Sequence, residues 1–365
     1  MNYLDLYHFK CFRNIQIPIN RLTALLGANG VGKSSVIQSL LLLKTAQTDY
    51  QRKGDYVPLN GPYGLTLGTA TDIITADVSD GFVKTALTDG KKVITEVVYE
   101  VNGIEEELGL KVSSVNGMRR KTFLDSLYFL SAERLGPRIS QPIHQMDELN
   151  VGVQGEYTAQ VLDYNKGLVK VQRDRMFPNT KDPNLPKQVN FWLDRILKGV
   201  QVYAVADYAG LTASIKLENR YSGGNNVLPT NIGFGISYAL PVITTGLIAK
   251  TGGLMIVENP EAHLHPAAQS AMGEFLGMVA RSGVTVMVET HSDHIINGIQ
   301  LDAARHPEFA EMITINNFSP VKGELQPKVD SISISDKGEI KNWPEGFMDQ
   351  SQKDFMELMN INANK

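Results

Sequence analysis

Gly27-Ala28-Asn29-Gly30-Val31-Gly32-Lys33-Ser34 matches the pattern Gly-x-x-x-x-Gly-Lys-[Ser/Thr] at every defined position. The mostly apolar residues 21–26, just before it, predict a short strand, and apolar residues recur at helical spacing from Lys33 to about residue 46. A glycine-rich loop between a strand and a helix turns its backbone N–H groups and the positive end of the helix dipole toward a phosphate. We therefore expect a phosphate-binding loop made by Asn29, Gly30, Gly32, Lys33, Ser34 and Ser35.

Lys33 and Ser34 also predict a metal beside the phosphates. In loops of this kind the lysine neutralises the β- and γ-phosphates, and the serine hydroxyl binds Mg²⁺. Such a site also needs an acidic residue at the end of a neighbouring apolar strand. Residues 254–257 have a wholly apolar strand pattern, and Glu258 follows them directly. We therefore expect ATP and Mg²⁺ as cofactors, with the metal between Ser34 and Glu258.

The predicted elements follow two patterns along the chain. Short strands at 3–9, 15–19 and 21–26 are followed by strands at 82–88, 92–101, 107–115 and 127–130, which indicate an antiparallel sheet. Residues 47–81 show weak periodicity and are predicted to be loops. Helices are expected at 159–162, at 188–197 and from about 235, and strands at 202–205 and 211–217.

Strand and helix alternate in the last third of the chain. Strands are predicted at 254–257 and 284–288, and helices at 266–280 and 293–305. This alternation is typical of an α/β fold with a parallel sheet. The two halves of one nucleotide site thus lie far apart in the sequence, with roughly 200 residues between them.

Both ends of the chain, about residues 1–46 and 226–298, resemble ABC-type ATPase heads. Such heads occur in ABC transporters, structural-maintenance-of-chromosomes (SMC) proteins, RecF-like proteins and OLD-family (overcoming lysogenization defect) ATPases. The loop at 27–34 looks like the SMC and RecF variant. Glu258-Asn-Pro-Glu-Ala-His-Leu-His-Pro266 looks like the Walker B and D-loop region of bacterial OLD-like ATPases.

The resemblance implies an α/β ATPase head with a central, mostly parallel sheet, an additional antiparallel sheet and a helical subdomain. It implies one composite unit over residues 1–365. Its parts are an N-lobe at 1–46, a middle insertion at 47–225, a C-lobe at 226–318, and a C-terminal hairpin and tail at 319–365.

The same resemblance assigns further residues. His291, in Thr290-His291-Ser292, falls at the switch histidine, which contacts the γ-phosphate. Gly233, Gly235 and Ser237 open a helix at the position of the signature motif, which binds the ATP of a partner copy in a dimer.

Two further segments resemble parts of these ATPases. Residues 131–138 resemble the link between the two lobes, and Arg134 within them is expected to contact a phosphate or the other lobe, with a structural arginine as the equal alternative. Residues 332–347 resemble the tail of a bacterial group of such ATPases and predict a hairpin followed by a packed aromatic turn.

The catalytic position departs from the family pattern. The strand usually ends Asp-Glu-Pro, where the Asp serves Mg²⁺ and the Glu orients the attacking water, but here it ends Glu258-Asn259-Pro260. An amide cannot accept the proton of the water, and a positioned base is typically worth about 10²–10⁴-fold in rate. Either Glu258 does both jobs, or Glu261 or His291 positions the water, and the sequence leaves these alternatives open.

Composition narrows the classes of protein. The formal net charge of −4 gives no global attraction to DNA, so DNA binding would need a local patch such as Arg119-Arg120-Lys121 or Arg173 with Arg175. The single cysteine, Cys11, excludes an internal disulfide. No apolar run approaches the roughly 18 residues of a membrane span, and the N-terminus does not look like a signal peptide. We expect a cytoplasmic protein without membrane contact.

These observations favour an ATP hydrolase that acts as an ATP-dependent homodimeric switch or motor. The resemblance implies a place in bacterial defence or DNA repair beside an effector such as a nuclease. The alternative, motivated by Asn259, is a non-hydrolysing ATP sensor or scaffold that holds such an effector. His263 and His265 fit a D-loop better than a metal pair, and no acidic cluster outside the ATP site indicates a nuclease centre in this chain.

Overall fold

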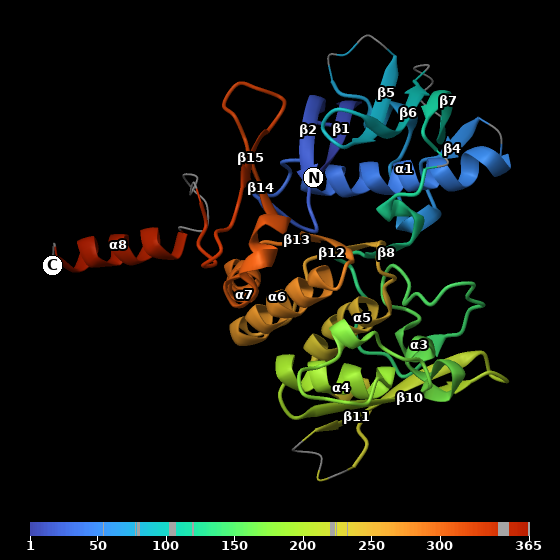
Figure 1. The fold of residues 1–365 in the computed structure, drawn as a ribbon, viewed down its shortest axis with the longest axis vertical. Coiled ribbons are helices and arrows are strands. Elements are labelled where there is room, and N and C mark those ends of the chain that lie inside the picture. The colour runs from blue at the N-terminus through green and yellow to red at the C-terminus, as the bar shows by residue number, and fades with distance from the viewer. Residues whose placement is uncertain are drawn as a thin grey trace.

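A central sheet divides the molecule into two layers (Figure 1). The computed structural model describes the chain except for residues 54, 77, 79–80, 102–106, 119, 220–222, 224, 232, 342–349 and 364–365. One antiparallel sheet lies above the central sheet in that view, and most of the helices lie below it.

Six strands form the central sheet, in the order β15-β14-β3-β13-β12-β8. They are β3 (Leu22–Gly27), β8 (Leu127–Leu130), β12 (Leu254–Glu258), β13 (Thr285–Glu289), β14 (Ile313–Ser319) and β15 (Lys328–Ile332). All neighbouring pairs are parallel except β14 with β15. After β3, the chain forms β8, β12 and β13 on one side of β3 and then β14 on the other side. The strand order therefore reverses at β3. Open α/β sheets bind ligands at the carboxyl ends of the strands at such a point.

Side-chain alternation along the parallel strands builds a separate core on each face of the sheet. Leu254 and Ile256 of β12 pack in the same core as α1 (Lys33–Lys53), whereas Met255 and Val257 pack in the core on the opposite face. Successive residues of a strand point to opposite faces, and a strand buried on both faces is therefore apolar throughout. The same alternation decides the direction of the residues at the strand ends.

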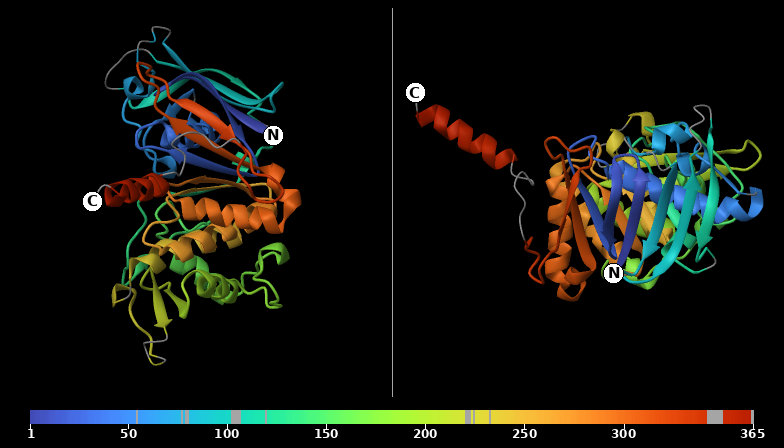
Figure 2. Two further views of the ribbon diagram at one scale, coloured as in Figure 1. Left: turned by 90° about the vertical axis from the view of Figure 1, so that its left-hand side faces the viewer. Right: turned by 90° about the horizontal axis from the view of Figure 1, so that it is seen from above.

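A six-stranded antiparallel sheet covers α1 on the side away from the central sheet (Figures 1 and 2). Its order is β2-β1-β5-β6-β7-β4. The strands are β1 (Asn2–Phe9), β2 (Phe12–Ile19), β4 (Tyr56–Pro58), β5 (Phe82–Thr88), β6 (Val93–Glu100) and β7 (Gly109–Asn116), and the short α2 (Ala70–Ile73) follows β4. Leu4, Leu6 and Val97 of this sheet share a core with Ile37 and Leu40 of α1.

Five helices and a small sheet cover the other face of the central sheet (Figure 1). The helices are α3 (Thr158–Gly167), α4 (Leu185–Ile196), α5 (Phe234–Ile248), α6 (Pro266–Arg281) and α7 (Asp293–Arg305). The small sheet has the order β10-β11-β9, with β9 (Gln141–Pro142), β10 (Val200–Asp207) and β11 (Thr212–Asn219).

Arg175 is fully buried within this helical layer. Its guanidinium donates to Oγ of Ser282 at 2.7 Å and to the carbonyl of Ala249. The suggestion that Arg175 belongs to a basic surface patch is therefore wrong. Arg119, from the other suggested patch, lies outside the described residues.

The C-terminal region begins with β15 at the edge of the central sheet. Ile334 and Ile340 then form an antiparallel bridge, as the predicted hairpin requires. The predicted aromatic turn, from Trp343 to Phe347, lies outside the described residues. The last helix, α8 (Gln350–Ala363), stands apart from the other elements in Figure 1 and in the right-hand view of Figure 2. Among the described helices, none is both long enough and apolar enough to cross a bilayer.

Two predictions for the middle of the chain are wrong. The strand at 127–130 does not belong to the antiparallel sheet, because β8 pairs in parallel with β12. All four of its residues are buried, as expected for a strand that is covered on both faces. Residues 47–81 are not all loop, since α1 continues to Lys53 and β4 pairs with β7. The boundary expected between residues 46 and 47 therefore falls inside α1.

Candidate functional site

The loop between β3 and α1 has a backbone shape that only glycine adopts readily. Gly30 and Gly32 have φ angles of 77° and 94°, which lie in the left-handed region. A Cβ atom on Gly32 would lie 2.6 Å from Sγ of Cys11, whereas no described heavy atom would lie within 4 Å of a Cβ on Gly30. The loop is thus supported from the Gly32 side and open at Gly30. Asn29 is exposed beside Gly30, and the partly buried Ser35 hydroxyl lies beside the Cys11 thiol.

Lys33 is folded back over this loop. Its Nζ donates to the carbonyl oxygens of Gly27 at 2.9 Å and of Ala28 at 2.7 Å, and only 4% of the residue is exposed. Burial lowers the pKa of Lys33, and the carboxylate of Glu289, 4.0 Å from Nζ, partly opposes that effect. The ammonium group of Lys33 therefore lies at the loop, where it could pair with a bound anion.

Two glutamates end neighbouring strands at the same register. Glu258 of β12 is paired with Glu289 of β13. Ile256 and Met287, two residues earlier in each strand, lie in the core that contains α1. Because side chains alternate with a period of two, both carboxylates point to the α1 side of the sheet. The carboxyl end of the sheet thus presents two acidic groups to the start of α1.

Glu289 contacts the phosphate-binding loop directly. Its carboxylate accepts a hydrogen bond from the Ser34 hydroxyl, with Oγ at 3.2 Å from Oε2 and 3.3 Å from Oε1. Burial is the main cause that raises the pKa of Glu289 to about 7, and the neighbouring Glu258 adds to the rise. Glu289 was not among the site residues predicted from the sequence. The signal for it was an acidic residue that closes a mostly apolar, buried strand.

Glu258 has a different set of partners. Its carboxylate accepts a hydrogen bond from the Ala132 N–H at 2.9 Å. Burial raises the pKa of Glu258, against the opposing influence of that hydrogen bond and of Arg134. Glu258 is thus attached to the segment that follows β8, at the same end of the sheet as Ser34.

Glu261 holds the segment that carries His291. Its two carboxylate oxygens accept hydrogen bonds from the Thr290 hydroxyl at 2.7 Å and from the His291 N–H at 2.9 Å. His291 is largely exposed, and its partial burial, followed by the nearby Lys33 charge, lowers its pKa. Three residues predicted for catalysis, Glu258, Glu261 and His291, are therefore brought to one end of the sheet with Lys33 and Ser34.

Arg134 joins backbone segments at this end of the sheet. Its guanidinium donates to the carbonyl oxygens of Ser131, Glu258 and Asn259. Burial lowers the pKa of Arg134 to about 10, so it stays charged at neutral pH. Of the alternatives for Arg134, the structure favours a structural contact between segments over a phosphate contact. Asn259 itself has a φ of 44°, and its buried Oδ1 accepts no hydrogen bond from the described residues.

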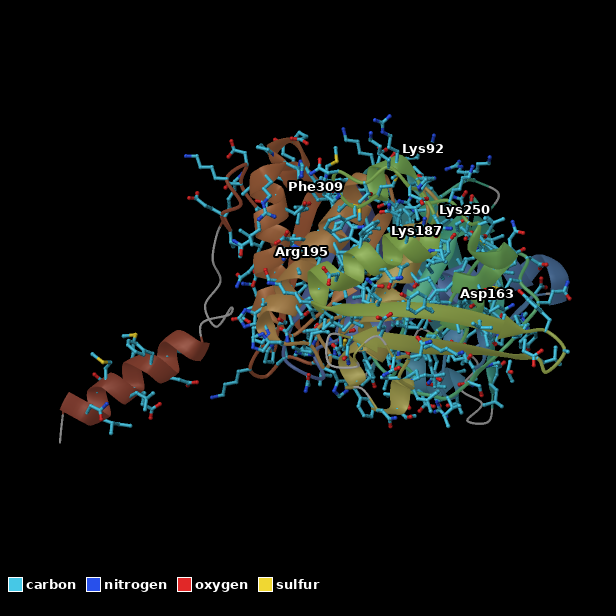
Figure 3. All side chains as sticks on the ribbon, turned by 90° about the horizontal axis from the view of Figure 1, so that it is seen from below. Lys92, Asp163, Lys187, Arg195, Lys250 and Phe309 are labelled. Atoms are coloured by element: carbon cyan, nitrogen blue, oxygen red, sulfur yellow. The ribbon has the colours of Figure 1, made fainter. Side chains whose placement is uncertain are left out.

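The residues at the signature-like position line two hollows around the start of α5. Gly233 caps the start of α5 and, with Gly235, lines a hollow of about 610 Å³ together with His263, His265 and Arg195. None of the residues that line it belongs to the loop 27–34. Figure 3 shows Arg195 on α4, where it pairs with Glu274 of α6 at 3.2 Å. Ser237 lines a neighbouring hollow with Leu135 and Arg138.

His263 and His265 make structural contacts. His263 packs edge-on against Tyr238, with ring centroids 4.6 Å apart, and Nδ1 of His265 accepts the Ala267 N–H at the start of α6. In the part of the chain that the structure describes, no cluster of three or more His, Cys, Asp or Glu side chains suits a metal ion.

The donor set of this site fits a nucleotide with magnesium. The open glycine loop and the first turn of α1 supply N–H groups for phosphates, and Lys33 supplies a cation. Mg²⁺ prefers oxygen ligands and is commonly bound by one or two carboxylates together with substrate phosphates and water. Ser34, Glu258 and Glu289 offer such oxygens on one face.

One curated protein is similar in sequence to most of this chain. Over 341 aligned residues, the chain is 23% identical to the OLD nuclease of Thermus scotoductus, covering 83% of this chain. It spans 61% of the length of that relative.

Two solved structures of SMC heads share the fold. One is an SMC head bound to the C-terminal winged-helix domain of ScpA, with a TM-score of 0.52, 13% identity and coverage of 91% of this chain and 97% of the head. The other, from Pyrococcus furiosus, is an SMC head with an extended coiled coil bound to the C-terminal domain of ScpA. It has the same TM-score and identity, and the match covers 98% of this chain and 100% of that head.

Two family descriptions match parts of the chain. Residues 319–358 match a family described as a protein of unknown function, DUF3696. Residues 22–297 match the family described as an AAA domain, putative AbiEii toxin of a type IV toxin–antitoxin system. The chain therefore belongs to that AAA-domain family, as an ABC- and SMC-like P-loop ATPase with resemblance to OLD-family proteins.

Proposed function

We propose that this chain binds ATP with Mg²⁺ at the carboxyl end of its central sheet. The N–H groups around Asn29, Gly30, Gly32 and Ser35 would receive the phosphates, Lys33 would neutralise them, and Ser34 with Glu258 would hold the metal. The observation that carries this proposal is the convergence of Lys33, Ser34 and Glu258 on one face of the sheet, although they are far apart in the sequence.

Hydrolysis of ATP is the second part of the proposal. Asn259 stands at the usual base position, so another group must position the attacking water. Glu261 is already engaged by Thr290 and the His291 N–H, which suits a residue that positions the His291 segment. Glu258 has one carboxylate oxygen bonded to Ala132 and is the group we propose for the water. His291 would contact the γ-phosphate.

We further propose that ATP joins two copies of the chain. In that arrangement Gly233, Gly235 and Ser237 of one copy would face the ATP of the other. The hollow lined by Gly233 and Gly235 has no described lining residue from the loop 27–34 of the same copy, which supports this idea. The dimer would act as a switch or motor in a bacterial defence or DNA-repair complex beside an effector such as a nuclease.

Phosphate release from ATP tests the hydrolysis. Lys33→Ala serves as the blank, and Asn259→Glu restores the usual base. We expect slow wild-type turnover above the blank and faster turnover in Asn259→Glu, by up to the roughly 10²–10⁴-fold that a positioned base contributes. Wild-type release equal to the blank, with no gain in Asn259→Glu, would reject an ATP hydrolase.

Asn259 also favours a second candidate function, a non-hydrolysing ATP sensor or scaffold that holds an effector. This candidate predicts tight ATP binding and no turnover in the wild type, with turnover appearing only in Asn259→Glu. Rapid wild-type turnover that is abolished by Lys33→Ala would exclude it.

A further inference from the structure

The carboxylate nearest to the expected metal ligand is Glu289, not Glu258. β13 lies next to β3, whereas β12 lies one strand further away. Strands in a sheet are about 4.8 Å apart, so β12 is roughly 10 Å from β3 and β13 roughly half that distance. Both glutamates point to the α1 side. Strand order therefore places Glu289 between Glu258 and the start of α1.

The hydrogen bonds agree with the strand order. The Ser34 hydroxyl donates to the carboxylate of Glu289, at 3.2 and 3.3 Å from its two oxygens, while the carboxylate of Glu258 accepts the Ala132 N–H. Glu289 is also within 4.0 Å of Nζ of Lys33. Lys33 and Ser34 both belong to the phosphate-binding loop.

This contact has a defined chemical effect on a metal site. A hydroxyl group that donates its hydrogen to a carboxylate turns its lone pairs away from that carboxylate, toward a cation on the other side. A carboxylate behind a ligand in this way orients it and raises its basicity. Two buried carboxylates beside a single lysine also leave excess negative charge that a divalent cation would balance.

We propose that Glu289 is a magnesium-positioning residue, which accepts the Ser34 hydroxyl proton in a hydrogen bond and so orients Ser34 toward the metal of Mg²⁺–ATP. This inference rests on the proposed function and adds to it a division of labour. Glu289 serves the metal through Ser34, whereas Glu258 serves the metal directly and positions the water.

The test measures how nucleotide binding depends on the metal. A fluorescent N-methylanthraniloyl ATP is titrated in EDTA and then at increasing Mg²⁺ concentration. In Glu289→Gln we expect binding in EDTA within about twofold of wild type, and a half-saturating Mg²⁺ concentration that is raised about 10–100-fold, the usual effect of losing such a supporting group. Glu308→Gln, on an exposed side chain, is the matched control and should behave as wild type.

A double-mutant cycle separates positioning from general damage to the fold. If Glu289 acts through Ser34, then Ser34→Ala and Glu289→Gln have non-additive effects on the Mg²⁺ requirement. Additive effects would overturn the inference and leave the proposed function intact. The same holds if the half-saturating Mg²⁺ concentration is unchanged in Glu289→Gln while Glu258→Gln no longer responds to Mg²⁺. Absence of nucleotide binding in the wild type would instead overturn the proposed function.

Discussion

The carboxyl group of Glu289 lies at a buried position, where its ionised form is unfavourable. The residue is 7% exposed, and burial together with Glu258 raises its pKa to about 7. The native state therefore binds its proton more tightly than the unfolded chain does, so stability falls as pH rises from about 4.5 to about 7. A residue kept at such a position, beside Ser34, Lys33 and the carboxylates of Glu258 and Glu261, suits a site that awaits a cation.

Glu289→Gln is expected to stabilise the protein when no metal is bound. The amide is neutral at every pH, so its advantage should be small at pH 5 and reach about 3 kcal/mol at pH 8, which corresponds to a pKa raised from 4.5 to about 7. Urea unfolding in EDTA at both pH values measures the difference. A difference that does not change with pH would contradict the assignment, and Glu308→Gln should show none.

Arg134 acts by donating hydrogen bonds to three backbone carbonyl groups, and not by binding a ligand. Replacing it with Met leaves the carbonyl oxygens of Ser131, Glu258 and Asn259 without their donor. We expect a loss of at least about 2 kcal/mol in the free energy of unfolding, since hydrogen bonds from charged groups contribute roughly 1.5–3 kcal/mol. Arg138→Met, at an exposed position of the same segment, should have little effect. Equal effects of the two substitutions would contradict this role.

At the scale of elements, α6 and α7 approach closely enough for their backbones to touch. A Cβ atom on Gly298 of α7 would lie 2.0 Å from the carbonyl oxygen of Ser270 in α6. These helices follow β12 and β13 directly, so their packing sets how the two strands that end in glutamates lie side by side. The site depends on this contact between α6 and α7, although no residue from the interior of either helix belongs to the site.

Gly298→Ala is expected to destabilise the protein by about 1–3 kcal/mol, the usual effect of overpacking. Alanine favours a helix over glycine by up to about 1 kcal/mol, but the contact is too short for that gain to prevail. Thermal unfolding measures the loss. Leu301→Ala, an exposed position on the same helix, serves as control, and an equally stable Gly298→Ala would show that the helices separate easily.

The strand ends show what the sequence could predict and what it could not. Lys33 and Ser34 were predicted from the glycine-loop pattern between a strand and a helix, and Glu258 from its position at the end of a wholly apolar strand. Glu289 was missed because its role depends on strand order, and no local pattern places β13 beside β3. The strand β14 was not predicted because Asn316 and Asn317 interrupt its apolar pattern. The Asn316 amide is satisfied by the Pro18 carbonyl and the Ser331 hydroxyl, contacts from distant segments.

At the scale of the whole molecule, the hollow at α5 has no described lining residue from the loop 27–34. Phe234 is 51% exposed at the start of α5, and its ring centroid lies 5.2 Å from that of His263. If two copies meet as proposed, this aromatic residue would lie in the interface, next to Gly233 and Gly235. A large exposed aromatic group beside a glycine-rich helix start is well suited to contact between proteins.

Phe234→Arg is expected to prevent the proposed ATP-dependent dimer. Light scattering with Mg²⁺–ATP should show a doubled mass for the wild type and a single-copy mass for Phe234→Arg and for Lys33→Ala. Tyr208→Arg, at an exposed position on the turn after β10, should dimerise as the wild type does. Dimers that persist in Phe234→Arg would place the interface elsewhere.

The strand order of the central sheet also determines when the nucleotide site can form during synthesis. β3 ends at Gly27, but its two neighbours, β13 and β14, begin only at Thr285 and Ile313. At about 5–20 residues per second, a ribosome needs roughly 15–60 s to make the intervening chain. During that time an apolar strand has both edges open, so the nascent chain is exposed to aggregation. The phosphate-binding loop is synthesised early, but both neighbours of β3 are complete only at Ser319, and a chain that is interrupted before that residue would lack a complete β14 beside the loop.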